Sequence, residues 1–260
     1  MIYLLIISLC LLPIKSLLCS DSDSTQINYT RLAITTVGGL TLGCYALDKS
    51  LDIWGRDRGA FHFKDDWKGD NLEQTDEVSH MFVAYKVAQT ASYLLKWDGF
   101  SDKWANILGS GLSFGWLFIV EYPIDSYNPY QGFGVSDLIF DIAGSAFAYL
   151  RATYPSLRKF DLRISTKTNP FDMKRIIAWT VDEYDSWVYW LSYTPNPRKI
   201  PLSISVGYAS WREKRNEPKR EWHIAFTISF YELYSFVNRS ENKMDFWGIY
   251  QLPVAEDILY

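Results

Sequence analysis

Residues 75–89 read TDEVSHMFVAYKVAQ, and this stretch decides how the surrounding chain is expected to fold. Thr75 is a suitable helix N-cap, and Asp76 suits the first turn because the helix dipole stabilises a negative charge there. His80 follows Asp76 by four residues, so both side chains lie on one face of the helix. The stretch therefore predicts a helix over residues 75–95 that places a carboxylate beside an imidazole on an otherwise apolar surface.

Two later segments, EYPID and SDLIFD, repeat this spacing of four with pairs of carboxylates. Each borders a long apolar run, and charged groups on apolar helices are costly to bury unless they are paired or bind a metal. In the first pair, Pro123 lies between the two carboxylates and interrupts the helix, which weakens the same-face argument there. We therefore expect one polar site inside a group of helices. Its candidate metal ligands are Asp76, His80, Glu121, Asp125, Asp137 and Asp141.

Four stretches have the length and composition of helices. The first and third contain uncharged runs of 16 and 17 residues, at or below the lower limit for crossing a bilayer. Their glycines would let membrane helices pack closely. We therefore expect a mainly α fold, in which residues 21–153 form a four-helix membrane-associated bundle and residues 154–260 a smaller C-terminal segment. The four predicted helices cover residues 32–47, 75–95, 103–122 and 136–151.

The C-terminal segment carries the clearest strand pattern, which makes the whole chain α+β. Residues 202–211 (LSISVGYASW) and 221–230 (EWHIAFTISF) alternate large apolar with small side chains, as strands with one apolar face do. The charged linker between them, REKRNEPKR, predicts a long β-hairpin that packs on the helices, and its basic side chains suit anionic lipid headgroups. Within residues 172–193, aromatic side chains recur near helical spacing, so we expect a short amphipathic helix there.

Residues 1–20 read MIYLLIISLCLLPIKSLLCS and predict a secretory signal peptide. The apolar run is too short to span a bilayer, and a polar segment follows it. Cys19 raises the alternative of lipid attachment, although Leu18 stands where such signals have a small residue. Cleavage after Ser20 would leave Cys44 as a lone thiol, and its apolar neighbours are typical of a small buried residue.

The net charge of −4 argues against a nucleic-acid partner, because nucleic-acid-binding domains usually carry a basic patch. Aromatic residues make up 17% of the chain, which fits either a membrane–water interface or a large aromatic core. Two aromatic loops, residues 54–67 and 126–133, offer rings for stacking against a ligand. The candidate ligand-binding residues in these loops are Trp54, Tyr127 and Tyr130.

The order of these motifs resembles the YfiM-like family of uncharacterised bacterial envelope proteins, which is similar to the VanZ-like membrane proteins. The resemblance runs from about Leu32 to Arg151 and includes FHFKDDW, TDEVSHMFVAYKVAQ, VEYPIDSYNPYQGFGVSD and DIAGSAFAYL. Glu77 stands where the family usually has Lys, and Asp141 where it usually has Asn. Both departures imply a more acidic site, which favours a bound cation over an Asp–Lys ion pair. The resemblance implies an exported, membrane-associated protein of the bacterial cell envelope and brings no established reaction.

Three functions fit this sequence, and whether the protein is an enzyme stays open. The favoured hypothesis is a non-catalytic envelope protein whose buried Asp/His/Glu cluster is a hydrogen-bonded network that fixes helix packing. Its partners would be membrane lipids or other components of the cell envelope.

The second hypothesis is a metal-assisted hydrolase acting on a lipid or cell-wall substrate, with Asp76, His80 and Glu121 as candidate catalytic residues. Carboxylates and one imidazole can hold a divalent metal ion that activates a water molecule. Against it, the chain lacks HExxH and phosphate-binding loop motifs. The third hypothesis is a module that binds a glycolipid or peptidoglycan fragment at the membrane surface through its aromatic loops.

Overall fold

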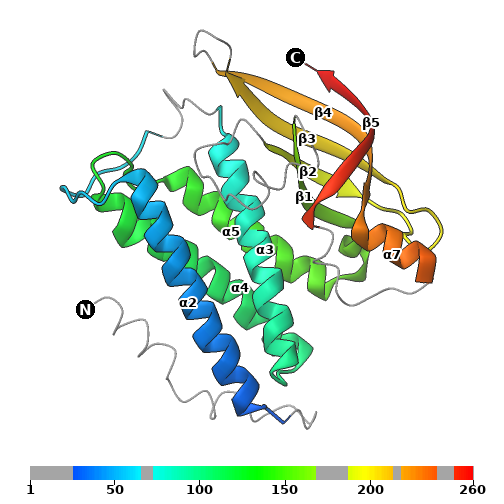
Figure 1. Ribbon diagram of the computed structural model, residues 1–260, viewed down its shortest axis with the longest axis horizontal. Helices are drawn as coiled ribbons and strands as arrows, with labels where there is room; N and C mark the ends of the chain where they lie inside the picture. Colours follow the sequence, from blue (N-terminus) through cyan, green and yellow to red (C-terminus); the bar gives the residue numbers. More distant parts are fainter. Residues whose placement is uncertain (1–25, 66–72, 168–186, 213–217, 239–248, 260) are drawn as a thin grey trace.

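The computed structural model describes residues 26–65, 73–167, 187–212, 218–238 and 249–259. The expected signal peptide and Cys19 lie outside these residues. Figure 1 shows two parts, a group of long helices and a twisted antiparallel sheet at one end of that group. The chain passes from the first part to the second between residues 153 and 160.

The long helices are α2 (Tyr29–Trp54), α3 (Thr75–Trp97), α4 (Asp102–Ile119) and α5 (Val135–Thr153). Two of them begin where polar side chains satisfy free backbone N–H groups. Asn28 accepts a hydrogen bond from the Arg31 N–H at 3.0 Å, and Ser101 accepts one from Trp104 at 3.5 Å. Thr75 is the first helical residue of α3 rather than its N-cap, which is Gln74.

Small residues let α3, α4 and α5 pack closely. A Cβ atom on Gly109 of α4 would lie 2.5 Å from the backbone nitrogen of Ser92 on α3. On α5, a Cβ atom on Gly144 would come closer still to the Met81 carbonyl oxygen of α3. Real side chains do not fit at such distances, so these two glycines are required for the observed helix spacing.

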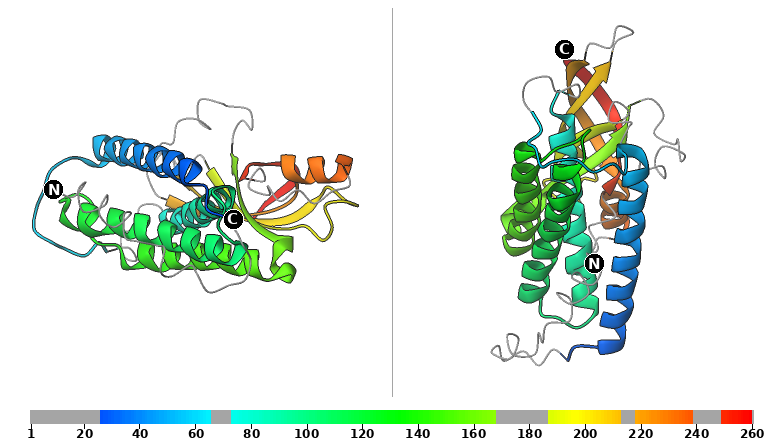
Figure 2. Two further views of the ribbon diagram at one scale, coloured as in Figure 1. Left: turned by 90° about the horizontal axis from the view of Figure 1, so that it is seen from below. Right: turned by 90° about the vertical axis from the view of Figure 1, so that its left-hand side faces the viewer.

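Helix α2 lies alongside this group, as Figure 2 shows. Near its start, the Thr35 hydroxyl donates a hydrogen bond to Asp98 at 2.7 Å. Further along, the apolar side chains of Val37 and Leu42 are exposed, Leu42 by 70%. The predicted four-helix bundle is therefore wrong, because three helices form the packed group and α2 exposes much of its apolar surface beside it.

One helical stretch in the described part of the chain, Asp102–Tyr127, is long and apolar enough to cross a membrane. It comprises α4, a π-helical turn η2 (Val120–Ile124) and a 3₁₀ turn η3 (Asp125–Tyr127). A third of its most hydrophobic window is buried inside the protein. Core helices of proteins without membrane spans meet the same criterion, so this helix does not by itself establish a span.

The sheet has five described strands, all antiparallel and in chain order. An isolated bridge between Ile164 and Tyr250 brings its two edges together, so the sheet is curled. Helix α7 (Phe230–Asn238) follows the fourth strand directly. The strands are β1 (Phe160–Thr166), β2 (Trp187–Tyr193), β3 (Ser203–Arg212), β4 (Pro218–Ser229) and β5 (Gln251–Leu259).

The predicted fold class is wrong for this half as well, because a complete sheet stands where one hairpin was expected. Residues 187–193, assigned above to an amphipathic helix, form strand β2 between β1 and β3. The rest of that predicted helix, residues 172–186, lies outside the described residues. Closely spaced aromatic residues fit either period, and pairing with two neighbouring strands decides in favour of the strand. The fold is α+β.

The sheet buries its polar face and exposes much of its apolar face. Ser203 and Ser205 of β3 are buried and point into the curl, whereas Ile204 and Val206, which alternate with them, are exposed. The apolar face contacts helix α3 through β1, β2 and β3, and the ring centroid of Tyr189 on β2 lies 5.8 Å from that of Phe82 on α3. The alternation that predicted the hairpin is therefore correct, but its large apolar side chains are largely uncovered.

Ion pairs inside the curl compensate the buried charges. Arg163 lies 3.2 Å from Asp161 on its own strand and 2.5 Å from Glu232 on α7. Lys86 of α3 also pairs with Asp161, at 3.2 Å, and links the helices to the sheet. Ser203 donates a hydrogen bond to Glu232 at 2.6 Å. Because these charged groups have partners, the network is structural in character.

Candidate metal site

The predicted site residues come together around a small polar cavity of about 30 Å³. It lies between the start of α3, the segment η2–η3 and the start of α5, under the loops before α3 and α5. The cavity exceeds the roughly 10–15 Å³ that one water molecule needs. It is lined by Trp54, Lys64, Asp76, His80, Glu121, Asp125, Gln131, Gly132 and Asp137.

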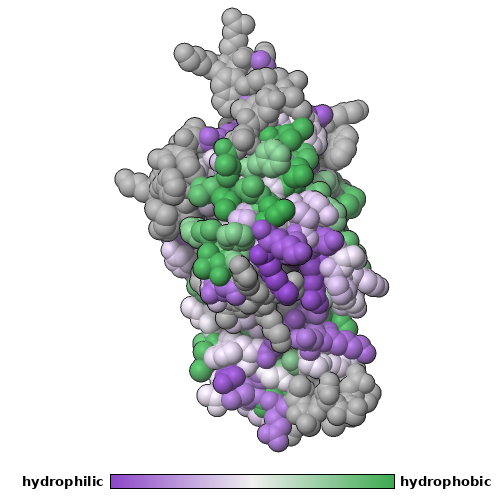
Figure 3. Space-filling view, turned by 90° about the vertical axis from the view of Figure 1, so that its right-hand side faces the viewer, coloured by the Kyte–Doolittle hydropathy of each residue, from purple (hydrophilic) through white to green (hydrophobic). Residues whose placement is uncertain are grey.

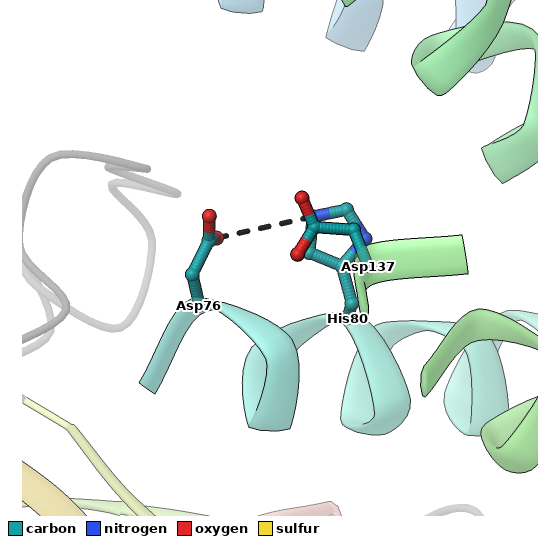
Figure 4. Close-up of side chains that lie close together, drawn as sticks. All are labelled: Asp76, His80 and Asp137. Atoms are coloured by element: carbon teal, nitrogen blue, oxygen red, sulfur yellow. Dashed lines mark ion pairs between the residues drawn. The ribbon is translucent and has the colours of Figure 1, made fainter. Parts of the chain in front are cut away.

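His80 is at the centre of this cluster. Its Nδ1 atom lies 3.1 Å from Oδ1 of Asp141, which is fully buried on α5. Its Nε2 atom faces the cavity, 3.8 Å from Asp76 and 4.0 Å from Glu121. Figure 4 shows His80 beside Asp76 of the same helix and Asp137 of α5. Three elements therefore direct carboxylates towards one imidazole.

The protonation of His80 follows from these neighbours. Burial acts to lower the pKa of His80, because it removes water from the charged form. The hydrogen bond to Asp141 and the charges of Asp137 and Asp76 act in the opposite direction and raise the pKa well above 6.5. In this arrangement His80 is protonated at neutral pH and is the cation that the carboxylates share.

Lys64 is a site residue that the sequence analysis did not identify. Its ammonium group lies 2.8 Å from Asp76 and 3.2 Å from Asp137. Backbone hydrogen bonds fix its loop. The Lys64 N–H donates to the Phe133 carbonyl at 3.1 Å, and the Phe133 N–H donates to the His62 backbone carbonyl at 2.9 Å. An Asp–Lys ion pair, which the two sequence departures argued against, is therefore present, with the lysine supplied by another segment.

Glu77 does not take part in the cavity. It is buried, and it accepts a hydrogen bond from the Ser136 hydroxyl at 3.1 Å. Its position on α3 next to Asp76 turns its side chain towards the start of α5 instead. Glu77 is not among the residues that line the cavity, so it adds no carboxylate there, and the expected preference of the site for a cation rests on the other residues.

Glu121 and Asp125 both reach the cavity despite the proline between them. The backbone leaves helical geometry at Tyr122 and Pro123 and resumes it at Ile124, so the two carboxylates still line one space. The Gly134 N–H donates a hydrogen bond to Glu121 at 3.1 Å. Burial raises the pKa of Glu121 to about 8 and the pKa of Asp125 to about 7.

The cluster holds more negative groups than positive ones. Four carboxyl groups line the cavity with one lysine, so negative charges exceed positive ones by two even when His80 is protonated. Within this cluster, Oδ1 of Asp125 and Oδ2 of Asp141 are buried without a hydrogen-bond partner in the described part of the chain. Buried acceptors of this kind are costly, so the site favours an additional cation or proton.

The ligand atoms have the spacing of a metal site. Two groups of three, Asp76–His80–Asp137 and His80–Glu121–Asp141, each place one donor atom per residue within 4.8 Å of the other two. The hydrogen bond from Nδ1 to Asp141 orients the ring and leaves Nε2 towards the cavity. Such a carboxylate–histidine pair commonly supports a metal-bound imidazole.

The three candidate ligand-binding aromatics are not brought together in one cavity. Trp54 lines the polar cavity, and its carbonyl accepts a hydrogen bond from the Asn128 amide at 3.2 Å. Tyr127 packs in an aromatic cluster, with its ring centroid 5.9 Å from that of Phe61. Tyr130 is 71% exposed. A shared stacking platform formed by these residues therefore stays a prediction.

Residues 65–153 match the model of a family described as predicted periplasmic lipoprotein (DUF2279). The match covers about a third of the chain, from the loop before α3 to the end of α5, and includes His80 and all five carboxylates around it. It confirms the predicted localisation as an exported, membrane-associated protein of the bacterial cell envelope. The YfiM-like and VanZ-like resemblances stay predictions. Neither a curated protein nor a solved structure matches the chain.

Proposed function

We propose that this envelope protein binds a divalent cation in the cavity around His80, and that the cation ties α3, η2–η3 and α5 together. The observation that carries the proposal is the excess of buried carboxylates around one oriented imidazole. A metal-bound imidazole is neutral, so cation binding would displace the proton of His80 and leave three excess negative charges among the groups that line the cavity. A doubly charged ion compensates most of this charge, whereas the metal-free site relies on protons held by His80, Glu121 and Asp125.

The roles of the residues follow from their positions. Nε2 of His80 and the carboxylates of Asp76, Glu121 and Asp137 face the cavity and are the proposed ligands. Asp141 lies behind the ring and orients it. Lys64 contacts Oδ2 of Asp76, whereas Oδ1 of the same carboxylate is the atom nearest His80. Lys64 can therefore remain paired while Asp76 also serves a cation.

The size of the cavity favours cation binding over hydrolysis of a lipid or cell-wall substrate. Pockets for small organic molecules have volumes of roughly 300–1,000 Å³. A cavity of about 30 Å³ accommodates an ion with one or two water molecules and no glycan or lipid. The unpartnered oxygens in turn count against a purely hydrogen-bonded network, because such networks stabilise a core when all members are satisfied.

The donor set indicates the class of metal. Carboxylate oxygens suit Mg²⁺, Ca²⁺ and Mn²⁺, whereas an imidazole nitrogen suits Zn²⁺ and other transition metals. One histidine among several carboxylates therefore fits Mn²⁺ or Zn²⁺ better than Ca²⁺.

Thermal unfolding tests the proposal. The melting temperature of metal-free wild type should rise on addition of Mn²⁺ or Zn²⁺, because a ligand that binds only the folded state stabilises it. His80→Ala should abolish the rise, and His62→Ala should retain it, since His62 lies on a loop and contacts the Ala60 carbonyl. Equal stabilisation of both variants would show that the added metal binds elsewhere. No stabilisation of wild type by any divalent cation would favour the structural network.

A further inference from the structure

The outer face of the curled sheet presents apolar side chains to the surroundings. The register aligns Leu191, Val206 and Ile224 on three adjacent strands, and Ile204 with Phe226 beside them. These five side chains are 46–53% exposed. Sheets of water-soluble proteins usually turn such a face inward, because burying apolar surface is the main driving force of folding. The polarity of this part of the sheet is therefore inverted, although Val188, Trp190, Ala209 and Ala225 form a buried apolar cluster.

Helix α7 has the same inversion. It buries Glu232 and Ser235 against the sheet and exposes Phe230, Leu233 and Val237. Glu232 enters the curl to pair with Arg163, so the buried polar side of α7 is needed inside the protein. The apolar side of α7 therefore faces outward. Helix α7 follows β4 without an intervening loop. Figure 3 shows hydrophobic surface gathered on the side of the molecule that carries the sheet and α7.

The sequence between β3 and β4 is basic. Residues 212–220, REKRNEPKR, hold five basic and two acidic residues, although the whole chain has a net charge of −4. Residues 213–217 lie outside the described part of the chain, and Arg220 pairs with Glu73 at 2.7 Å. Trp222 follows on β4 and is half exposed. Basic residues next to a tryptophan and an apolar face are typical of segments at the surface of an anionic membrane.

We propose that the outer face of β2–β4 and α7, here called the outer apolar surface, docks on an anionic phospholipid bilayer. Acyl chains would cover the apolar side chains, and the net positive charge of the sequence between β3 and β4 would favour an anionic bilayer over a neutral one. A bilayer fits better than a second copy of the chain because the charge is complementary and the protein is membrane-associated. The docking is separate from the cation cavity, which lies among the helices.

Photolabelling of the full chain tests this docking. Vesicles of phosphatidylcholine and phosphatidylglycerol would carry a phospholipid with a photoactivatable acyl chain, and labelled peptides would be identified by mass spectrometry. We expect labels in residues 202–206, 222–226 and 230–237. The double substitution Ile224→Glu and Phe226→Glu should reduce labelling of these peptides about tenfold, because two apolar side chains that would enter the bilayer are replaced by charges. Ile139→Glu on α5, where Ile139 is 56% exposed, should leave it unchanged.

Three results would overturn the proposal. The first is labelling that never includes these peptides although the protein sediments with the vesicles. The second is equal labelling of the double variant and wild type. The third is a dimer in light scattering that the double substitution dissociates, which would assign the surface to a second copy. Circular dichroism checks that the variants fold, and Ile204→Gln provides a milder substitution for the same comparison.

Discussion

Nδ1 of His80 on α3 lies 3.1 Å from the fully buried Oδ1 of Asp141 on α5. This hydrogen bond joins two helices and sets the orientation of the ring, so that Nε2 faces Asp76 and Glu121 across the cavity. Asp141 itself does not line the cavity, and its effect on a cation would pass through His80. The roles of ligand and orienting group can therefore be separated by mutation.

Replacing Asp141 should weaken cation binding without removing a proposed ligand that faces the cavity. We expect Asp141→Ala to reduce the affinity for Mn²⁺ by about 10- to 100-fold, as observed for groups that orient metal-bound histidines. Asp141→Asn keeps a hydrogen-bond acceptor and should have a smaller effect. Calorimetric titration measures both affinities. Unchanged affinity in Asp141→Ala would show that the orientation of His80 does not matter for binding.

The stability of the metal-free protein should fall as the pH rises between about 4 and 8. Burial raises the pKa of Glu121 to about 8 and of Asp125 to about 7, above their ordinary values of 4.5 and 3.8. The folded state therefore holds these protons more tightly than the unfolded state, and this stability is lost as the pH rises through the raised values. The raised pKa of His80 acts in the same direction.

Melting temperatures across this pH range provide the measurement. Glu121→Gln should reduce the pH dependence, because its amide does not titrate. Saturating Mn²⁺ should also reduce it, since the cation replaces the protons as the partner of the carboxylates. A melting temperature that rises with pH over the same range would contradict the assigned pKa directions.

Lys64 should stabilise the metal-free protein. Lys64→Met removes an ammonium group from Asp76 and Asp137, and the loss should be about 1–3 kcal/mol because the pair is only partly exposed. Lys49→Met is the matched control, since its ion pair with Asp52 is exposed on α2 and should contribute close to nothing. Urea unfolding measures both free energies. Equal losses in the two variants would mean that the cavity charges are already balanced without Lys64.

The charged network inside the sheet should be more sensitive to mutation. Arg163→Met removes the ion-pair partner of Glu232 and leaves Asp161 paired with Lys86 alone, and it should reduce the free energy of unfolding by about 3–5 kcal/mol. Arg198→Met, on an exposed loop, should change it little. The cation affinity of folded Arg163→Met should be unchanged. A change in that affinity would show that the sheet and the cavity are coupled.

The positions of α3, α4 and α5 were predictable because their apolar runs are separated by polar segments rich in glycine and proline, which end helices locally. The spacing of Asp76 and His80 also predicted their common face. Lys64 was missed because its contact with Asp137 depends on how a loop folds over two helices, which no local pattern encodes. Glu77 was misplaced because adjacent residues on a helix point in different directions, and only packing shows which of them faces the site.

The sheet was less predictable for a related reason. Alternation along β3 and β4 defines two faces, but it does not say which face is covered. Which face of the sheet points inward is decided by contacts with residues far away in the sequence, such as Glu232 with Arg163 and Gln251 with Ser192. Strand β2 was assigned to a helix because its aromatic residues fit either period until β1 and β3 are paired with it.

Metal content tests the central claim most directly. The protein would be purified from membranes without chelator, and bound metals would be quantified by elemental analysis in wild type, His80→Ala and the control His62→Ala. We predict close to one divalent ion per chain in wild type and His62→Ala and a large loss in His80→Ala. No metal in any of the three proteins, with a lower melting temperature in His80→Ala alone, would contradict the proposal and leave the cluster as a structural network.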